Sequence, residues 1–195
     1  MAQNGRIQIT FERERKTLRS LLSFFNRGHR VEHADGNGVV PPVDISKAER
    51  FLATLTAKHG PLPPEAADIV TDSIATLVLD GSALLALASG HPRARAYVTW
   101  AVRMRTRVVV PATAFLDPAV AAIAGSVADV VPIYASTAEV ASTLITHARL
   151  SLPIDALHVA LASKLRPAAI LTRDPSGLRA LVNAADQSGV VVFTL

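Results

Sequence analysis

The sequence predicts an α/β protein whose parallel sheet is flanked by helices and preceded by a small helical or partly disordered N-terminal extension. Short runs rich in Val, Ile and Leu recur from residue 76 onward, and they alternate with helical stretches of roughly ten to fifteen residues. The runs are apolar throughout, which is typical of parallel strands buried on both faces of a sheet. With 195 residues, 50% of them hydrophobic and 18% charged, the chain suffices for one domain with a sizeable core and an extra segment.

Composition narrows the classes of protein that the chain can belong to. It contains no cysteine, which excludes disulfide scaffolds, thiolate zinc sites and cysteine nucleophiles. We find no secretion signal at the start, and the most apolar long stretch, 118–135, is interrupted by Pro, Gly and Asp129. We therefore expect a cytoplasmic protein with no membrane partner. The formal net charge of +4 is compatible with nucleic acid as a partner without requiring it.

Residues 1–45 are predicted to be a basic arm followed by a linker. The first thirty residues carry seven basic and two acidic side chains, and 33–45 are rich in Gly, Pro, Asn and Asp. The arm is either a solvated, partly disordered segment or a short strand followed by a helix.

Residues 46–72 are predicted to form two short helices joined by a proline-rich turn. The first begins with a capping box at Ser46 and Glu49 and ends at Gly60, and the second covers 65–71. The apolar face of the first helix is formed by Ala48, Phe51, Leu52 and Leu55. Two helices of this size have too little core to fold alone, so we expect them to pack against the rest of the chain.

Residues 73–195 are predicted to form the main domain. The expected strands are 76–80, 107–110, 130–133, 168–172 and 189–195. The expected helices are 82–88, 93–104, 111–124, 136–149, 153–164 and 177–185, with a second capping box at Ser136 and Glu139.

Four aspartates of this domain fall where strands end or where the next helix begins. Asp80 directly follows the first strand, and Asp174 follows the fourth by two residues. Asp155 lies in the first turn of its helix, and Asp117 about two turns into the helix that opens at Pro111. Each has a structural explanation as a cap, a turn residue or a complement to a helix dipole. Ligands nevertheless collect at the carboxyl ends of parallel strands, so we expect the four side chains to share one edge.

A convergence of carboxylates predicts a cation. Four carboxylates within about 5 Å of one another would repel by roughly 3 kcal/mol per pair at an effective dielectric constant near 20. Oxygen ligands without Cys or a His pair select Mg²⁺ or Mn²⁺. Such a site activates water and stabilises charge on a phosphodiester, so metal-assisted phosphodiester cleavage is the predicted chemistry.

Four stretches, taken in order, resemble a PIN-domain nuclease, and specifically the toxin (VapC-type) ribonucleases of bacterial toxin–antitoxin pairs. They are VLDGSALLALASG (78–90), RVVVPATAFLD (107–117), SLPIDALHVALA (151–162) and AILTRDPSGLRAL (169–181). The resemblance covers about 120 residues and implies a PIN-like sheet, an RNA substrate and catalysis with one or two Mg²⁺ or Mn²⁺ ions.

The resemblance assigns roles to individual residues. Asp80, Asp155 and Asp174 match the family's aspartates, and Asp117 stands where the family usually has Glu. All four are therefore expected to be catalytic and to bind the metal. Asp117 is one methylene shorter than Glu and precedes Pro118, which should bend or end its helix. Two hydroxyl residues match positions that support the metal ligands in the family, Ser82 and Thr172.

Basic residues around the expected site are candidates for RNA contact. Arg93, Arg95 and Arg173 are expected to bind phosphate, although the arginines of 93–107 equally fit a solvated helix face. His158 lies on the same helical face as Asp155, and a packed core histidine is the favoured interpretation.

The front segment resembles part of another protein class. Residues 48–70 are similar to the toxin-binding tails of actinobacterial antitoxins, which implies an antitoxin-like segment fused to its own nuclease domain. The antitoxin partner is then either this segment in cis, 46–72, or a separate chain, and the family also commonly forms homodimers. Removing 1–72 is expected to raise nuclease activity, unless the segment is a passive extension. The alternative function is a PIN-fold binding module, or a self-neutralised fusion, with little or no turnover.

Overall fold

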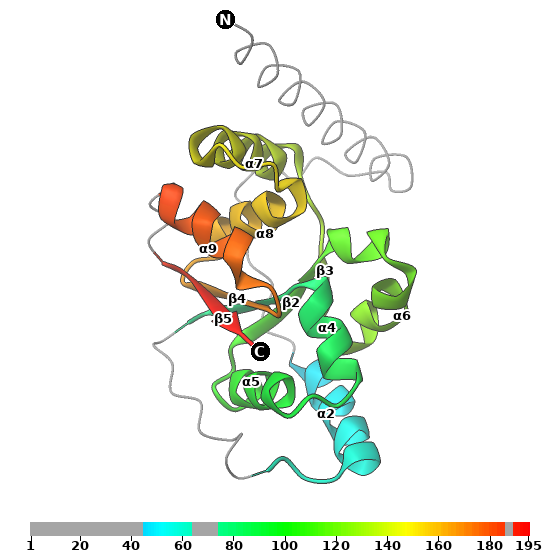
Figure 1. Ribbon diagram of the computed structural model, residues 1–195. Helices are drawn as coiled ribbons and strands as arrows, with labels where there is room; N and C mark the ends of the chain where they lie inside the picture. Colours follow the sequence, from blue (N-terminus) through cyan, green and yellow to red (C-terminus); the bar gives the residue numbers. More distant parts are fainter. Residues whose placement is uncertain (1–44, 64–73, 186–188) are drawn as a thin grey trace, which may run out of the picture.

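The computed structural model describes residues 45–63, 74–185 and 189–195. The predicted α/β class is confirmed, since five parallel strands form one sheet in the order β3-β2-β1-β4-β5 (Figure 1). The strands are β1 (Thr76–Leu79), β2 (Arg107–Pro111), β3 (Asp129–Val131), β4 (Ala168–Thr172) and β5 (Val190–Thr194). The basic arm, apart from residue 45, and the short helix predicted at 65–71 lie outside the described residues.

The helices follow the predicted alternation closely. They are α2 (Ser46–His59), α4 (Gly81–Ala88), α5 (Pro92–Arg103), the 3₁₀ helix η1 (Ala112–Leu116), α6 (Pro118–Val127), α7 (Ala135–Ala148), α8 (Pro153–Lys164) and α9 (Pro175–Ala184). No helix among the described residues has the length and apolar character that a membrane crossing needs.

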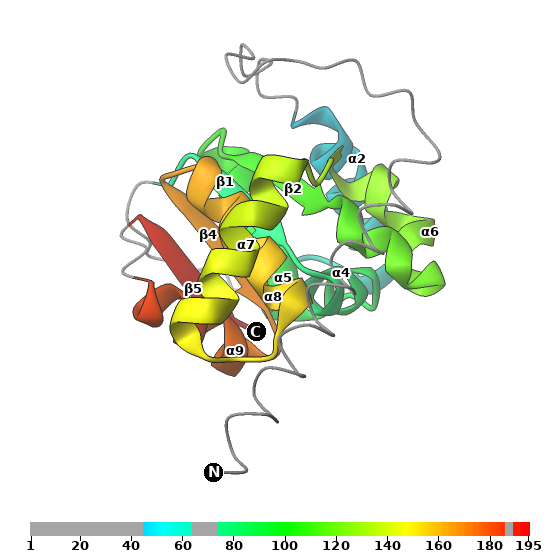
Figure 2. The ribbon, with the colours of Figure 1, turned by 90° about the horizontal axis from the view of Figure 1, so that it is seen from above.

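Helices α4, α5 and α6 cover one face of the sheet and α7, α8 and α9 cover the other (Figures 1 and 2), and the sheet separates two hydrophobic clusters. Alternate residues of a strand face opposite sides, so Leu77 and Leu79 of β1 pack with α4, α5 and α6. Val78, between them, packs on the other side with α7, α8 and α9. Both clusters contain fully buried strand residues, which explains why the strand sequences are apolar throughout.

The order in which the chain adds strands to the sheet reverses at β1, so a topological switch point lies between β1 and β4. The chain passes from β1 to β2 and β3 on one side, then crosses over to β4 on the other side of β1. Neighbouring strands β1 and β4 pair in parallel, with Leu79 opposite Leu171. In open parallel sheets, ligands bind beyond the carboxyl ends of the strands that flank this point.

One expected helix is interrupted at Pro118 and so forms two shorter elements. The helix expected at 111–124 is divided, because η1 ends at Leu116 and Asp117 has an extended backbone before α6 starts at Pro118. Proline fixes its own backbone and disfavours a helical residue before it, so a helix restarts at Pro118 rather than continuing through it.

The two predicted capping boxes are wrong. The N-cap positions are Ile45 and Tyr134, one residue before the elements begin, and neither side chain caps its helix. Ser136 instead accepts a hydrogen bond from Lys164 Nζ at 2.6 Å.

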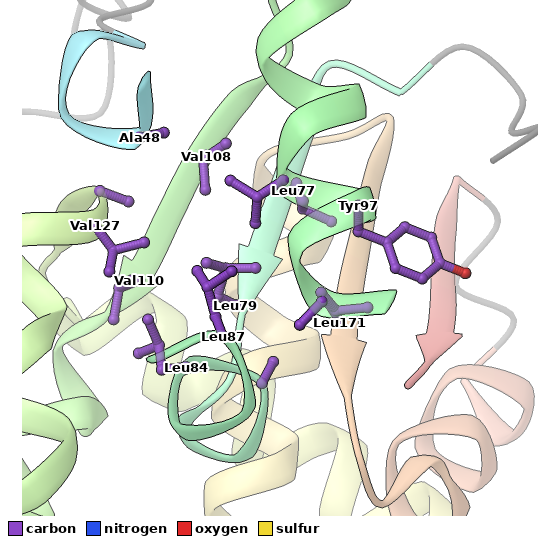
Figure 3. Packing of buried hydrophobic residues seen from close by; sticks show 14 of the residues in the cluster. Ala48, Leu77, Leu79, Leu84, Leu87, Tyr97, Val108, Val110, Val127 and Leu171 are labelled. Carbon is purple, nitrogen blue, oxygen red and sulfur yellow. The ribbon is translucent and has the colours of Figure 1, made fainter. Parts of the chain in front are cut away.

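Helix α2 packs against the domain, as its apolar face predicts. Ala48 and Leu55 are only 2% and 3% exposed and belong to the same cluster as Leu77 and Val108 (Figure 3). Polar contacts add to this packing, because Lys47 Nζ lies 2.7 Å from Asp129 Oδ1. Gly60 ends the helix with a positive φ of 79°, and its N–H donates to the carbonyl of Thr56.

Candidate functional site

Three of the predicted aspartates lie around the carboxyl ends of β1 and β4. Asp80 directly follows β1, and its N–H donates to the carbonyl of Leu171 in β4 at 3.2 Å. Asp174 follows β4 by two residues, and Asp155 belongs to the first turn of α8. The charges of Asp80 and Asp174 both act on Asp155, so the three carboxylates form one electrostatic group. We call these three residues the aspartate cluster.

Asp80 is buried and held in a fixed orientation. Its side chain is the N-cap of α4, where Oδ1 accepts hydrogen bonds from Ala83 N at 2.7 Å and Ser82 Oγ at 2.8 Å. An N-cap residue adopts a non-helical backbone and satisfies a free N–H of the first turn, which is why this aspartate follows the strand directly. Among the described residues no donor reaches Oδ2, so that oxygen is available to a ligand.

Hydroxyl groups connect the ends of the two strands. Ser82 Oγ accepts a hydrogen bond from Arg173 N at 2.8 Å and lies 3.4 Å from Thr172 Oγ1. Thr172 Oγ1 in turn accepts from Asp174 N at 3.0 Å. Ser82 and Thr172 therefore link Asp80 to the segment that carries Asp174.

Asp174 is the exposed member of the cluster. It is the N-cap of α9, and its Oδ1 accepts from Ser176 Oγ at 2.7 Å and from Ser176 N at 3.4 Å. Within the described part of the chain its other oxygen has no donor. Asp80 and Asp174 thus each use one oxygen to cap a helix and keep the second free.

The pKa of Asp155 is shifted by its surroundings. Burial raises the pKa of Asp155 from its ordinary value of 3.8 to about 6, and the charges of Asp80 and then Asp174 add to that effect. The described residues supply no hydrogen-bond donor to its carboxylate, which would otherwise stabilise the charged form. A cation placed among the three carboxylates would remove this repulsion.

Asp117 caps helix α6 and is not among the charges that act on Asp155. Its side chain is exposed, and its Oδ1 accepts from Ala119 N at 2.8 Å. The expectation that Pro118 ends the preceding helix is confirmed, because η1 ends at Leu116 and α6 starts at Pro118, whereas the role of Asp117 as a metal ligand stays a prediction.

The aspartate cluster offers the oxygen ligands that a hard cation prefers, but its three carboxylates are not close enough together to coordinate one in this conformation. Its donors are all carboxylate oxygens, and each residue has at least one oxygen without a described donor. In the described residues, however, no three His, Cys, Asp or Glu side chains are grouped closely enough to hold a metal ion. Mutual repulsion and the two helix caps favour this open arrangement.

The predicted arginines have different roles. Arg95 is 3% exposed, and its Nη2 donates to the carbonyl of Gly60 at 2.6 Å and lies 3.4 Å from Thr56 Oγ1. It therefore anchors the end of α2, and its prediction as an RNA contact is wrong for this conformation. Arg93 is exposed beside the Tyr97 ring, and Arg173 is exposed immediately after β4.

His158 is buried beneath the cluster, as the favoured interpretation expects. Its Nε2 lies 2.8 Å from Thr113 Oγ1, and its Nδ1 is buried without a partner among the described residues. Burial lowers the pKa of His158, while the charge of Asp80 acts in the opposite direction. The histidine is thus held neutral in the core and connects α8 to η1.

Thr113 and Gly177 contact His158 and Asp155, respectively, and neither was predicted from the sequence. Thr113 could have been noticed because it is a hydroxyl residue just after β2. Gly177 lies against the carboxylate of Asp155, and nothing in its sequence context distinguishes it from an ordinary helix glycine.

None of the comparisons with protein-family models, with curated proteins and with solved structures gives a match for this chain.

Proposed function

We propose that the protein is a Mg²⁺- or Mn²⁺-dependent endoribonuclease that hydrolyses RNA phosphodiesters at the aspartate cluster. The observation that carries the proposal is the meeting of Asp80, Asp155 and Asp174 beside the topological switch point, with a raised pKa on Asp155. The choice of RNA among phosphodiesters rests on the sequence resemblance to toxin-type PIN nucleases.

The free oxygens of the three aspartates would hold the cation. When bound, Mg²⁺ or Mn²⁺ would activate a water molecule and stabilise the charge that develops on the phosphodiester. Asp80 and Asp174 are suited to holding it because helix caps and the Ser82–Thr172 link fix their orientation. Asp155, whose charge burial and the other two acids disfavour in the metal-free protein, is suited to completing the shell of the cation or orienting the attacking water.

Arg173 is the best placed of the predicted arginines to contact RNA. It is exposed, directly follows β4, and its main chain is fixed by Ser82 next to Asp80. An arginine at this position can pair with a phosphate oxygen next to the scissile bond. Arg93, which is exposed on α5, remains a candidate for a more distant phosphate.

The experiment is RNA cleavage by the full-length protein with EDTA, Mg²⁺ or Mn²⁺. Asp80→Asn is the test variant because Asn also caps helices well, and Glu139→Gln, an exposed acid on α7, is the matched control. We expect metal-dependent cleavage that Asp80→Asn abolishes and Glu139→Gln retains. Cleavage that survives EDTA or Asp80→Asn would refute the proposal.

A second candidate is a binding module with little or no turnover. It is favoured by the open cluster and by the position of Asp117, which leaves three acids where the resemblance implies four. Calorimetric titration with Mn²⁺ separates the two functions. Micromolar binding that needs Asp80 supports the nuclease, and RNA binding without any Mn²⁺ binding supports the module.

We further propose that residues 46–72 act on the domain in cis as an antitoxin-like segment. The described part of this segment, α2, docks through Leu55, the Lys47–Asp129 ion pair and Arg95. Tethering gives an effective concentration in the millimolar range, so even a weak contact stays nearly saturated.

The contacts of α2 define how it can act. Lys47 meets the first residue of β3, and the His59 ring lies beside Gly90, beyond the C-terminal end of α4. Both contacts are far from the carboxyl ends of β1 and β4, so α2 itself does not cover the aspartate cluster. We expect any inhibition by this segment to act through α5 and α6, which α2 contacts, rather than through α2 covering the aspartate cluster.

A further inference from the structure

Helix α9 begins against the carboxylate of Asp155. A Cβ atom built on Gly177, the third residue of α9, would overlap Asp155 Oδ2 and would come within 2.7 Å of Leu152 Cδ1. The Leu152 contact involves the end of a flexible side chain, which can move at little cost. The Asp155 contact involves a carboxylate that also interacts with Asp80 and Asp174.

The backbone does not require glycine at this position. Gly60, Gly90 and Gly189 have positive φ angles, which explains glycine there, whereas Gly177 is not among the positive-φ residues. Glycine inside a helix is unfavourable relative to alanine. The close approach of Asp155 Oδ2 gives a steric reason for glycine at this position, which Gly125 in α6 lacks.

The first turn of α9 is a favourable neighbour for a carboxylate. The N–H groups of the first turn lack partners within the helix, and the helix dipole places partial positive charge there. Asp174 caps this end from the preceding loop, and Asp155 approaches it from α8. A bare glycine at the third position lets two acids from different elements meet at one helix end.

We propose that Gly177 is a positioning residue for Asp155, because the absence of a side chain at Gly177 allows the carboxylate to reach Asp80 and Asp174. A side chain there would push Asp155 away from the other two acids. This role rests on the proposed function only where metal binding is concerned, since the steric claim holds for the metal-free protein.

The steric claim is tested by thermal unfolding of full-length variants in EDTA. Gly125, inside α6, has no atom within 4 Å of a built Cβ and provides the matched control. We expect Gly125→Ala to raise Tm by about 2–4 °C and Gly177→Ala to lower it. In an Asp155→Ala background, where the overlapping oxygen is absent, Gly177→Ala should become stabilising like Gly125→Ala.

A further variant separates the two contacts of the added Cβ. Leu152→Ala removes the apolar neighbour and leaves the carboxylate, so Gly177→Ala should remain destabilising in that background. Rescue by Leu152→Ala, or no rescue by Asp155→Ala, would overturn the proposal. If Gly177→Ala alone fails to fold, the double variant with Asp155→Ala still gives the decisive comparison.

The consequence for metal binding is measured by Mn²⁺ calorimetry without RNA. We expect Gly177→Ala to weaken Mn²⁺ binding by about tenfold or more, and Gly125→Ala to leave it unchanged. Wild-type affinity in folded Gly177→Ala would overturn the positioning role. If the wild-type protein does not bind Mn²⁺, the proposed nuclease function fails, and the unfolding measurements alone decide the role of Gly177.

Discussion

Replacing Asp155 by asparagine should stabilise the metal-free protein at neutral pH. Asn retains the shape of the side chain and removes the charge that burial, Asp80 and Asp174 disfavour. A rise in the pKa of Asp155 from 3.8 to about 6, at about 1.36 kcal/mol per pKa unit, corresponds to about 3 kcal/mol. Because the side chain of Asp155 is partly exposed, solvent screening reduces the expected gain to about 1–2 kcal/mol.

The sign of the pH dependence follows from the direction of the shift. The folded state binds the Asp155 proton more tightly than the unfolded chain, so this group favours folding below pH 3.8. Its contribution is lost as pH rises through about 6. Wild-type protein and Asp155→Asn should therefore be equally stable near pH 4, and the variant should be the more stable above pH 6.

The assay is urea unfolding in EDTA between pH 4 and 8, with Glu139→Gln as the control. The control should follow the wild type at every pH. If the free energies of unfolding of Asp155→Asn and the wild type differ by the same amount from pH 4 to 8, the reasoning is refuted. It is also refuted if Asp155→Asn is less stable than the wild type at pH 8. Saturating Mn²⁺ should stabilise the wild type and leave Asp155→Asn nearly unaffected.

The remaining predictions compare residues with contrasting environments. Arg95→Ala should cost about 1–3 kcal/mol in urea unfolding because it removes a buried side chain and its hydrogen bond to the half-buried carbonyl of Gly60, whereas Arg173→Ala should leave stability unchanged and weaken RNA binding in a salt titration. The opposite pattern would restore Arg95 as an RNA contact. Leu55→Ala should cost about 2–4 kcal/mol and the exposed Leu85→Ala less than about 0.5 kcal/mol, and equal losses would argue against docking of α2. Asp117→Ala should cost about 1 kcal/mol because it removes the cap of α6, and its Mn²⁺ affinity in calorimetry should match that of the wild type. Weaker Mn²⁺ binding by this variant would instead place Asp117 in the metal site.

The sequence predicts best where local pattern and tertiary structure agree. The bounds expected for α8 and β4 match the structure, because Pro153 starts the helix and an uninterrupted apolar run defines the strand. The positions of Asp80 and Asp174 are predictable because an acid within two residues of the end of a buried strand can both cap the next helix and lie at the carboxyl edge.

Predictions fail where the outcome depends on contacts between distant segments. Arg95 looks like part of a basic helix face, and only the docking of α2 gives it a carbonyl partner at Gly60. The capping boxes matched a motif, but the N-cap of α2 lies one residue and that of α7 two residues before the serine that the motif implies. The closeness of Gly177 to Asp155 follows from how α9 packs on α8, which no local pattern encodes.

Because α2 belongs to the same chain as the domain whose core buries Ala48 and Leu55, helix and domain are always present in a one-to-one ratio. A separate partner can be made in excess, diluted or degraded, and its occupancy then follows its concentration. A helix of the same chain that shares the core has no such freedom. A change in its docking has to come from local opening within the single molecule, at a rate independent of protein concentration.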